Sequence, residues 1–212
     1  MFKELKDIVG GENFSDDLTD RYIYSSDASI HQSLPSVILR HNKEEIKKTG
    51  AQKLLTLCPM CYKTFKNNPE YSDLGLEVVN ITQLLNKLNI QVKTEEIVTY
   101  HDPCDLGRHS GIYEEPREMI KKLAPHFVEM EKNRENAHCC GAGGRVRGSF
   151  TRLSIDMAKD RLKEALDKKA DVLLTECFSC LHNFKNAKKI KQNIKIYNIS
   201  EYLSILMDGG EK

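Results

Sequence analysis

A 14-residue segment occurs twice in this chain. LLTLCPMCYKTFKN (54–67) aligns without gaps to LLTECFSCLHNFKN (173–186), and eight of the fourteen positions are identical. Downstream of each copy, VVNIT (78–82) corresponds to IYNIS (196–200), and a Leu-containing stretch follows both. The repeat predicts two copies of one unit, each with a strand, a C-x-x-C at a helix start, a second strand and a helix.

Short apolar runs alternate with helical patterns from about residue 50 onward. Strands that alternate with helices are typical of an α/β fold with a mainly parallel sheet. The longest helix is predicted over residues 149–168, where Phe150, Leu153, Met157 and Leu162 recur at helical spacing. The predicted strands are 54–57, 78–81, 97–100, 127–130, 172–175 and 194–199.

The two copies of the unit are unequal in their cysteines. Three further cysteines, Cys104, Cys139 and Cys140, precede the second C-x-x-C, and at the repeat offset none of them has a cysteine counterpart before the first. We therefore expect three parts: an arm over 1–49, a partial first unit over 50–92 and a complete second unit over 93–212.

Composition argues against three classes of protein: those that bind nucleic acid, those that span a membrane and those that are exported. Lys and Arg total 32 and Asp and Glu total 31, a net charge of +1, which gives no electrostatic reason to expect nucleic acid as a partner. The longest apolar runs are strand-sized, so no transmembrane segment is predicted. Charges at Lys3, Glu4, Lys6 and Asp7 argue against a signal peptide. We expect a soluble, cytoplasmic protein.

Seven cysteines, an odd count in a chain without a predicted export signal, favour metal binding or redox chemistry over a disulfide framework. Five of them form the pattern C-x34-CC-x36-C-x-x-C, and all five are predicted at strand ends or loops of one α/β unit. Thiolates are the ligands that iron–sulfur clusters and zinc require, and five exceed what a four-coordinate zinc uses. The candidate ligands are Cys104, Cys139, Cys140, Cys177 and Cys180.

The residues around these cysteines identify a family resemblance. HDPCDLGR (101–108), HCCGAGG (138–144) and ECFSC (176–180) closely resemble the cysteine-rich CCG domain, which occurs in heterodisulfide reductase and in the iron–sulfur subunits of glycolate and lactate oxidases. The resemblance implies that the five cysteines hold a noncubane [4Fe–4S] cluster, or zinc in some copies. His101 and His138 are interpreted as neighbours of the ligands.

The same resemblance implies an oxidoreductase component that is not active alone. It implies electron transfer between a flavin-bearing partner subunit and a disulfide, quinone or similar acceptor, with other iron–sulfur subunits as further partners. The expected location is the cytoplasm, including attachment to the inner face of the membrane through a partner.

Residues 1–48 carry a second resemblance. YSSDAS (24–29) is similar to the opening of flavin-linked glycolate and D-lactate oxidases, yet no FAD-binding domain follows it here. We therefore expect FAD only in a partner or a missing domain. The arm is predicted to be poorly packed, with one helix over 2–9.

Other interpretations stay open at this stage. The same thiols permit a non-catalytic, zinc-stabilised interaction module, and the two resemblances together permit a non-functional remnant of a larger fused flavin/iron–sulfur oxidase. Cys58 and Cys61 have three interpretations: a structural role, a weaker second metal site, or a redox dithiol, because C-x-x-C after a strand is also the thioredoxin-like signal.

Overall fold

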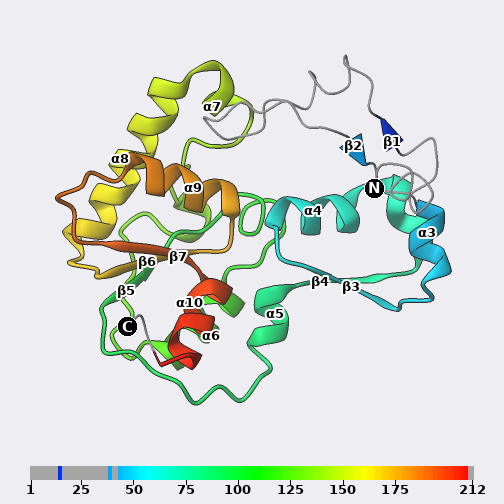
Figure 1. Ribbon diagram of the computed structural model, residues 1–212, viewed down its shortest axis with the longest axis horizontal. Helices are drawn as coiled ribbons and strands as arrows, with labels where there is room; N and C mark the ends of the chain where they lie inside the picture. The colour runs from blue at the N-terminus through cyan, green and yellow to red at the C-terminus, as the bar shows by residue number, and fades with distance from the viewer. Residues whose placement is uncertain (1–13, 16–37, 40–42, 210–212) are drawn as a thin grey trace.

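A three-stranded parallel sheet lies on the left of Figure 1, in a computed structural model that describes residues 14–15, 38–39 and 43–209. The strand order is β5–β6–β7, and Leu174 on the central strand lies opposite Tyr100 on one side and Tyr197 on the other. The strands are β5 (Val98–Tyr100), β6 (Val172–Thr175) and β7 (Lys195–Asn198).

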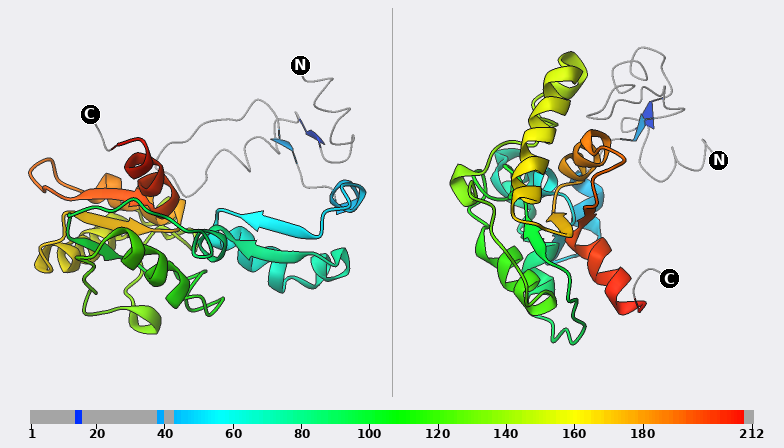
Figure 2. Two further views of the ribbon diagram at one scale, coloured as in Figure 1. Left: turned by 90° about the horizontal axis from the view of Figure 1, so that it is seen from below. Right: turned by 90° about the vertical axis from the view of Figure 1, so that its left-hand side faces the viewer.

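Helices cover both faces of this sheet (Figure 2). Because side chains alternate along a strand, Leu173 packs on one face, and Val172 and Leu174 pack on the other. One face is covered by α8 (Thr151–Asp167) and α9 (Phe178–Ala187), and the other by α6 (Glu114–Leu123) and α10 (Ile199–Met207). The three layers confirm the predicted α/β class.

The first copy of the repeat forms a separate two-stranded parallel sheet at one end of the molecule (Figure 1). Its strands are β3 (Lys53–Thr56) and β4 (Glu77–Asn80). The helices around it are α3 (Lys43–Lys48), α4 (Pro59–Asn67), the 3₁₀ helix η2 (Pro69–Leu74) and α5 (Ile81–Leu85). A short antiparallel pair, β1 (Phe14–Ser15) and β2 (Ile38–Leu39), precedes them.

The two copies share their local structure, as the repeat predicts. Cys58 precedes α4 with φ −102° and ψ 126°, and Cys177 precedes α9 with φ −100° and ψ 121°. The second helix of each copy begins with the same capping box, in which the Asn80 or Asn198 side chain accepts from the first turn and a Gln or Glu side chain accepts in return. The similar sequences of the two copies have therefore produced the same backbone conformation before α4 and before α9.

The strand predicted over 127–130 is wrong. The structure has only a single parallel bridge between Phe127 and Val98, with the Val128 amide donating to the Val98 carbonyl over 2.9 Å. Beyond this bridge, the Glu129 carboxylate binds Arg117 and the Met130 side chain enters the core.

The helix predicted over 149–168 is confirmed as α8, and a separate short helix, α7 (Val146–Ser149), precedes it. Phe150 and Leu153, predicted on its apolar face, are exposed. The buried face of α8 instead includes two polar residues, Ser154 and Arg161, because each has a hydrogen-bond partner inside the fold.

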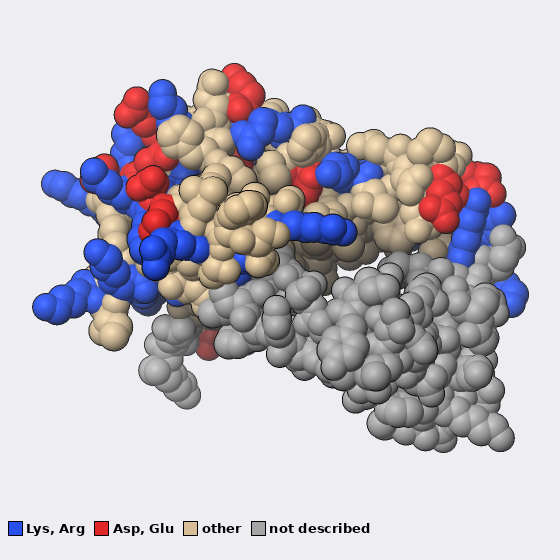
Figure 3. All heavy atoms as spheres, turned by 90° about the horizontal axis from the view of Figure 1, so that it is seen from above, with Lys and Arg blue, Asp and Glu red and all other residues tan. Residues whose placement is uncertain are grey.

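Charged side chains of both signs share the face shown in Figure 3, with Lys and Arg gathered at the end where the loop between α9 and β7 lies. The two lysines at the end of α9 and the start of β7 are paired with acids: Lys185 lies 3.5 Å from Glu201, and Lys195 lies 3.4 Å from Glu96.

Predictions for the arm fall outside the described residues, both the helix over 2–9 and the YSSDAS stretch. The boundaries of the three predicted parts also stay a prediction. Within 43–209 and the two short strands, no helix has the length and apolar character needed to cross a membrane.

Candidate metal centre

All five predicted ligand cysteines lie at the carboxyl edge of the three-stranded sheet. Parallel strands end at the same edge, so the loops after β5 and β6 meet there, and the loop before α7 joins them. Cys104 follows β5, Cys139 and Cys140 lie in the loop before α7, Cys177 caps α9, and Cys180 lies in its first turn.

Hydrogen bonds connect four of the five thiols. Cys140 contacts both Cys139 and Cys180, and Cys180 contacts Cys177. Cys104 lies close enough for its ionisation to respond to the charges of Cys140 and Cys177. The fold thus brings together, in one site, thiols from positions separated by up to 76 residues in the sequence (104 to 180).

The thiols differ in how readily they ionise. Hydrogen bonds from Cys139 and Cys180, and then from His101, hold the pKa of Cys140 well below its usual value. The hydrogen bond from Cys180, helped by the backbone amides at the start of α9, lowers the pKa of Cys177. The pKa values of Cys139 and Cys180 are raised in turn, chiefly because their thiols donate to these neighbours. Cys140 and Cys177 are therefore the two thiols of the site whose ionisation is favoured by their neighbours.

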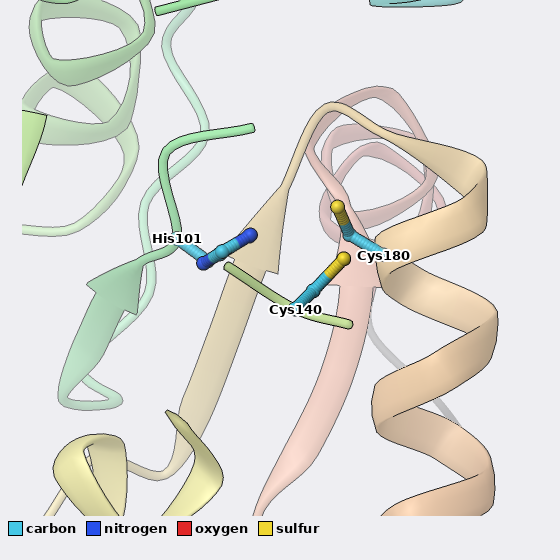
Figure 4. A group of neighbouring side chains, drawn as sticks. All are labelled: His101, Cys140 and Cys180. Carbon is cyan, nitrogen blue, oxygen red and sulfur yellow. The ribbon is translucent and has the colours of Figure 1, made fainter. Parts of the chain in front are cut away.

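His101 faces these thiols from the end of β5. One of its ring nitrogens and the sulfurs of Cys140 and Cys180 all lie within 4.8 Å of one another (Figure 4). The ring is buried, packs edge-on against Phe184 at 4.9 Å, and accepts a 3.2 Å hydrogen bond from Arg161 at Nδ1. Burial lowers the pKa of His101, so the ring is neutral and presents Nε2–H to Cys140.

His138, the other histidine beside a predicted ligand, lies at the surface. Its side chain is 60% exposed, and Nδ1 lies 2.7 Å from Glu164 on α8. Glu164 also accepts from Arg161 over 2.6 Å, so the exposed His138 and the buried His101 are held by the same helix.

The conformation of the loop that carries Cys139 and Cys140 depends on Gly141, and two of its backbone amides contact the cysteine sulfurs. Gly141 has φ +82°, and a Cβ there would lie 2.6 Å from the Ser154 carbonyl oxygen, so only glycine fits. The amides of Gly141 and Ala142 point at the sulfurs of Cys139 and Cys140, at 3.4 and 3.5 Å. These amides place partial positive charge against the two sulfurs.

A buried amide side chain fastens this loop to the helices. Asn183 on α9 donates 2.7 Å to the Cys140 carbonyl and 3.1 Å to the Ser154 carbonyl. Asn183 is fully buried, so one side chain joins the loop, α8 and α9 beside the thiols.

The loop that carries Cys104 is held by a buried ion pair. Arg117 on α6 is fully buried and donates to both oxygens of Asp102, at 2.7 and 2.9 Å, and to Glu129, at 2.7 Å. Asp102 also accepts from the Arg134 amide over 2.9 Å. Although burial alone lowers the pKa of Arg117, its hydrogen bonds to the two acids raise it above its usual value.

Glu176 is the most unusual neighbour of the thiols. Its side chain is fully buried, and neither carboxyl oxygen has a hydrogen-bond partner among the described residues. Burial, followed by the charge of Cys177, raises the pKa of Glu176 to about 8. The side chain is therefore a neutral acid at pH 7, placed directly before a ligand cysteine.

Cys58 and Cys61 do not join this site. They lie at the start of α4, where Cys61 is exposed and Cys58 is half-buried. Within the described part of the chain, no set of three His, Cys, Asp or Glu residues with ligand spacing includes either of them. A second metal site was predicted at this pair, but the described residues offer no third ligand for it.

Sequence reasoning missed the polar residues that support the site. Arg117, Arg161 and Asn183 occur on amphipathic helices, where charged and amide side chains are ordinarily solvent-exposed. The one available signal was the position of Arg161 on the same helical stripe as Ala158 and Ala165, since three- and four-residue spacing places these residues on one face.

Comparison with known proteins agrees with the arrangement of the cysteines. The family model of the CCG cysteine-rich domain matches residues 25–66 and 98–185, which cover both C-x-x-C motifs and the paired cysteines. The chain belongs to the CCG family of cysteine-rich domains. The family resemblance inferred from the cysteine spacing is therefore confirmed.

Curated relatives of this CCG chain occur in several oxidoreductases. It is 37% identical over 173 residues to one subunit of the dihydromethanophenazine:CoB–CoM heterodisulfide reductase of Methanosarcina acetivorans, with 76% of this chain and 42% of the relative covered. It is 32% identical to an uncharacterised iron–sulfur protein of Methanocaldococcus jannaschii, with 82% of this chain and 36% of that protein covered.

A third relative is also named as an oxidoreductase. EtfAB:quinone oxidoreductase of Syntrophomonas wolfei is 31% identical, over 82% of this chain and 26% of its own length. The chain thus spans less than half the length of the curated relatives named here. It is a cysteine-rich domain of the kind found in oxidoreductase subunits.

Proposed function

We propose that this chain is an iron–sulfur electron-transfer module of a larger oxidoreductase, and that Cys104, Cys139, Cys140, Cys177 and Cys180 hold a noncubane [4Fe–4S] cluster. The observation that supports the proposal is the position of these cysteines on loops at one edge of the sheet, with the sulfurs of Cys140 and Cys180 buried and within 4.8 Å of each other. The noncubane type follows from the family resemblance, and the iron–sulfur character is supported by the relatives.

The donor set suits such a cluster. Thiolates are the ligands of iron–sulfur clusters, and a tetrahedral zinc leaves one of five thiols unused. Adjacent cysteines are awkward ligands for one ion, but they can bind separate irons of a cluster. The amides of Gly141 and Ala142 and the start of α9 offset the negative charge that the thiolates bring.

The residues around the thiols have separate tasks in this proposal. A bound cluster supplies one-electron transfer. His101, held by Arg161, donates to Cys140 and keeps its sulfur in place. Asp102 and Arg117 fix the loop of Cys104, and Asn183 fixes the loop of Cys139 and Cys140. Fixed ligands and hydrogen bonds to sulfur set the reduction potential of such a centre.

The partner proteins and the electron acceptor are proposed by class. We propose a flavin-bearing subunit as electron donor or acceptor and a disulfide, a quinone or a similar acceptor on the other side, with other iron–sulfur subunits in the same complex. Relatives named as a heterodisulfide reductase subunit and a quinone oxidoreductase support this range of acceptors. Zinc binding without electron transfer is the competing function of the same thiols.

Metal analysis after anaerobic purification tests the proposal. We expect about four irons and about four sulfides per chain, broad visible absorbance, and a paramagnetic signal in one oxidation state. Serine replacement of any of the five cysteines should lower iron content severalfold, whereas the matched variant Cys58→Ser should retain it. One zinc per chain with a colourless protein would contradict the proposal.

A further inference from the structure

Cys58 and Cys61 form a second thiol site with its own geometry. Cys58 precedes the first residue of α4, and Cys61 lies in the first turn, so the two are three residues apart on one side of the helix start. Their thiols are hydrogen-bonded to each other. Both are free thiols, and Cys61 is exposed.

The comparison with the second copy of the repeat shows what this site lacks. Cys177 and Cys180 have the same backbone placement, but three further cysteines from other loops join them. At Cys58 and Cys61, no third ligand of suitable spacing is found in residues 43–209 or the two short strands. Two adjacent thiols are too few for a tetrahedral metal site, but they are enough for a disulfide.

We propose that Cys58 and Cys61 are a reversible dithiol–disulfide couple that exchanges with small-molecule disulfides. The proposal goes beyond the electron-transfer module and does not depend on which metal the five other cysteines bind. A C-x-x-C at a helix start after a strand is the arrangement in which such couples occur.

The two cysteines differ in their role. Cys58 is the N-cap residue of α4, and Cys61 lies in the first turn of that helix. In the proposed exchange Cys58 is the attacking sulfur, and Cys61 resolves the mixed disulfide.

The exchange balances in two steps. The Cys58 thiolate, having released its proton to solvent, attacks one sulfur of a disulfide, and the thiolate that leaves takes up a proton. Cys61 then loses its proton and attacks the Cys58 sulfur, and the second thiolate leaves and is protonated. Two electrons and two protons pass from the dithiol to the disulfide, which becomes two thiols.

Access and position support this chemistry. Leu57 and Met60, which flank the motif, are exposed, so the pair is open to a disulfide in solution. The same helix contacts the loop of Cys104 through Lys63, whose Nζ lies 2.5 Å from Asp105. Tyr62, next to Cys61, is fully buried and packs with Leu106 of that loop. The helix that carries the couple therefore contacts the loop of Cys104.

Redox titration of the anaerobically purified full chain tests the proposal. Glutathione buffers of graded ratio are followed by alkylation, trypsin and mass spectrometry. Cleavage after Lys53 and Lys63 releases both cysteines in one peptide, residues 54–63, while Cys177 and Cys180 fall in residues 170–185. We expect an internal disulfide whose ratio to the dithiol changes about tenfold for each tenfold change in the ratio of oxidised glutathione to the square of reduced glutathione.

Two variants assign the roles of the sulfurs. Cys61→Ser should accumulate a mixed disulfide with glutathione at Cys58, and Cys58→Ser should react with oxidised glutathione more slowly at Cys61. The proposal is overturned if peptide 54–63 stays a dithiol in oxidised glutathione alone, or if its disulfide joins two chains. It is equally overturned if both thiols resist alkylation until a chelator is added, which would indicate a bound metal.

Discussion

Arg161 donates a hydrogen bond from Nε to Nδ1 of His101 over 3.2 Å inside the fold. Because Arg cannot accept, Nδ1 is the unprotonated nitrogen of the ring, and the proton stays on Nε2. This one contact therefore decides that His101 is a hydrogen-bond donor to Cys140. Arg161 acts on the site through His101 and is a positioning residue.

Replacing Arg161 should remove the hydrogen bond that fixes the tautomer of the His101 ring. In Arg161→Met, we expect the free energy of unfolding of the metal-free chain to fall by about 1–3 kcal/mol, because the buried Nδ1 loses its donor. Nitrogen NMR of the His101 ring should show a mixture of tautomers where the wild type shows one. Arg152→Met, at an exposed position on the same helix, should change neither. An unchanged tautomer in Arg161→Met would contradict the assigned role.

The ion pair of Asp102 and Arg117 should contribute much more to stability than a pair at the surface. Asp102→Asn leaves a fully buried guanidinium short of a charge partner, and we expect a loss of about 3 kcal/mol or more in the free energy of unfolding. Glu77→Gln, which breaks an exposed pair with Lys53, should cost far less. Urea unfolding of both variants checks the contrast, and similar losses would refute it.

Glu176 should make the metal-free chain less stable as pH rises. Its pKa in the folded chain is about 8, above the usual 4.5, so between these values the folded state holds a proton that the unfolded state has released. The stability of wild type relative to Glu176→Gln should therefore fall by up to about 1.4 kcal/mol per pH unit from about pH 4.5 to about pH 8. It should be constant below that window. A difference that does not vary with pH would show that the acid is not buried.

Gly141 should be irreplaceable, unlike a neighbouring glycine. Gly141→Ala combines positive φ with a 2.6 Å approach to the Ser154 carbonyl oxygen, so the loop of Cys139 and Cys140 must shift away from α8. We expect a loss of about 1–3 kcal/mol in stability and severalfold lower iron content after reconstitution. Gly143→Ala meets no atom within 4 Å and serves as the control. Equal iron content in the two variants would contradict the prediction.

The sequence by itself determined the α/β class, the two copies of the repeat and the membership of the CCG family. These are local or spacing properties: alternating apolar runs fix strands and helices, and the repeated segment fixes the same N-terminal helix geometry at Cys58 and Cys177. The grouping of the five cysteines was predictable because parallel strands end at one edge. None of this required knowledge of which helix packs on which face.

The tertiary structure alone decided which polar residues are inside. Helical spacing placed Phe150 and Leu153 in the core, yet both are exposed, while Arg161 on the same chain segment is buried. The burial of Arg161 depends on two partners that accept from its Nε and Nη1, His101 and Glu164, one of them 60 residues away. The segment at Phe127 likewise forms a single bridge in place of the predicted strand, and Glu129 beyond it binds the buried Arg117. Partners so distant in sequence leave no local pattern, so only the folded chain reveals them.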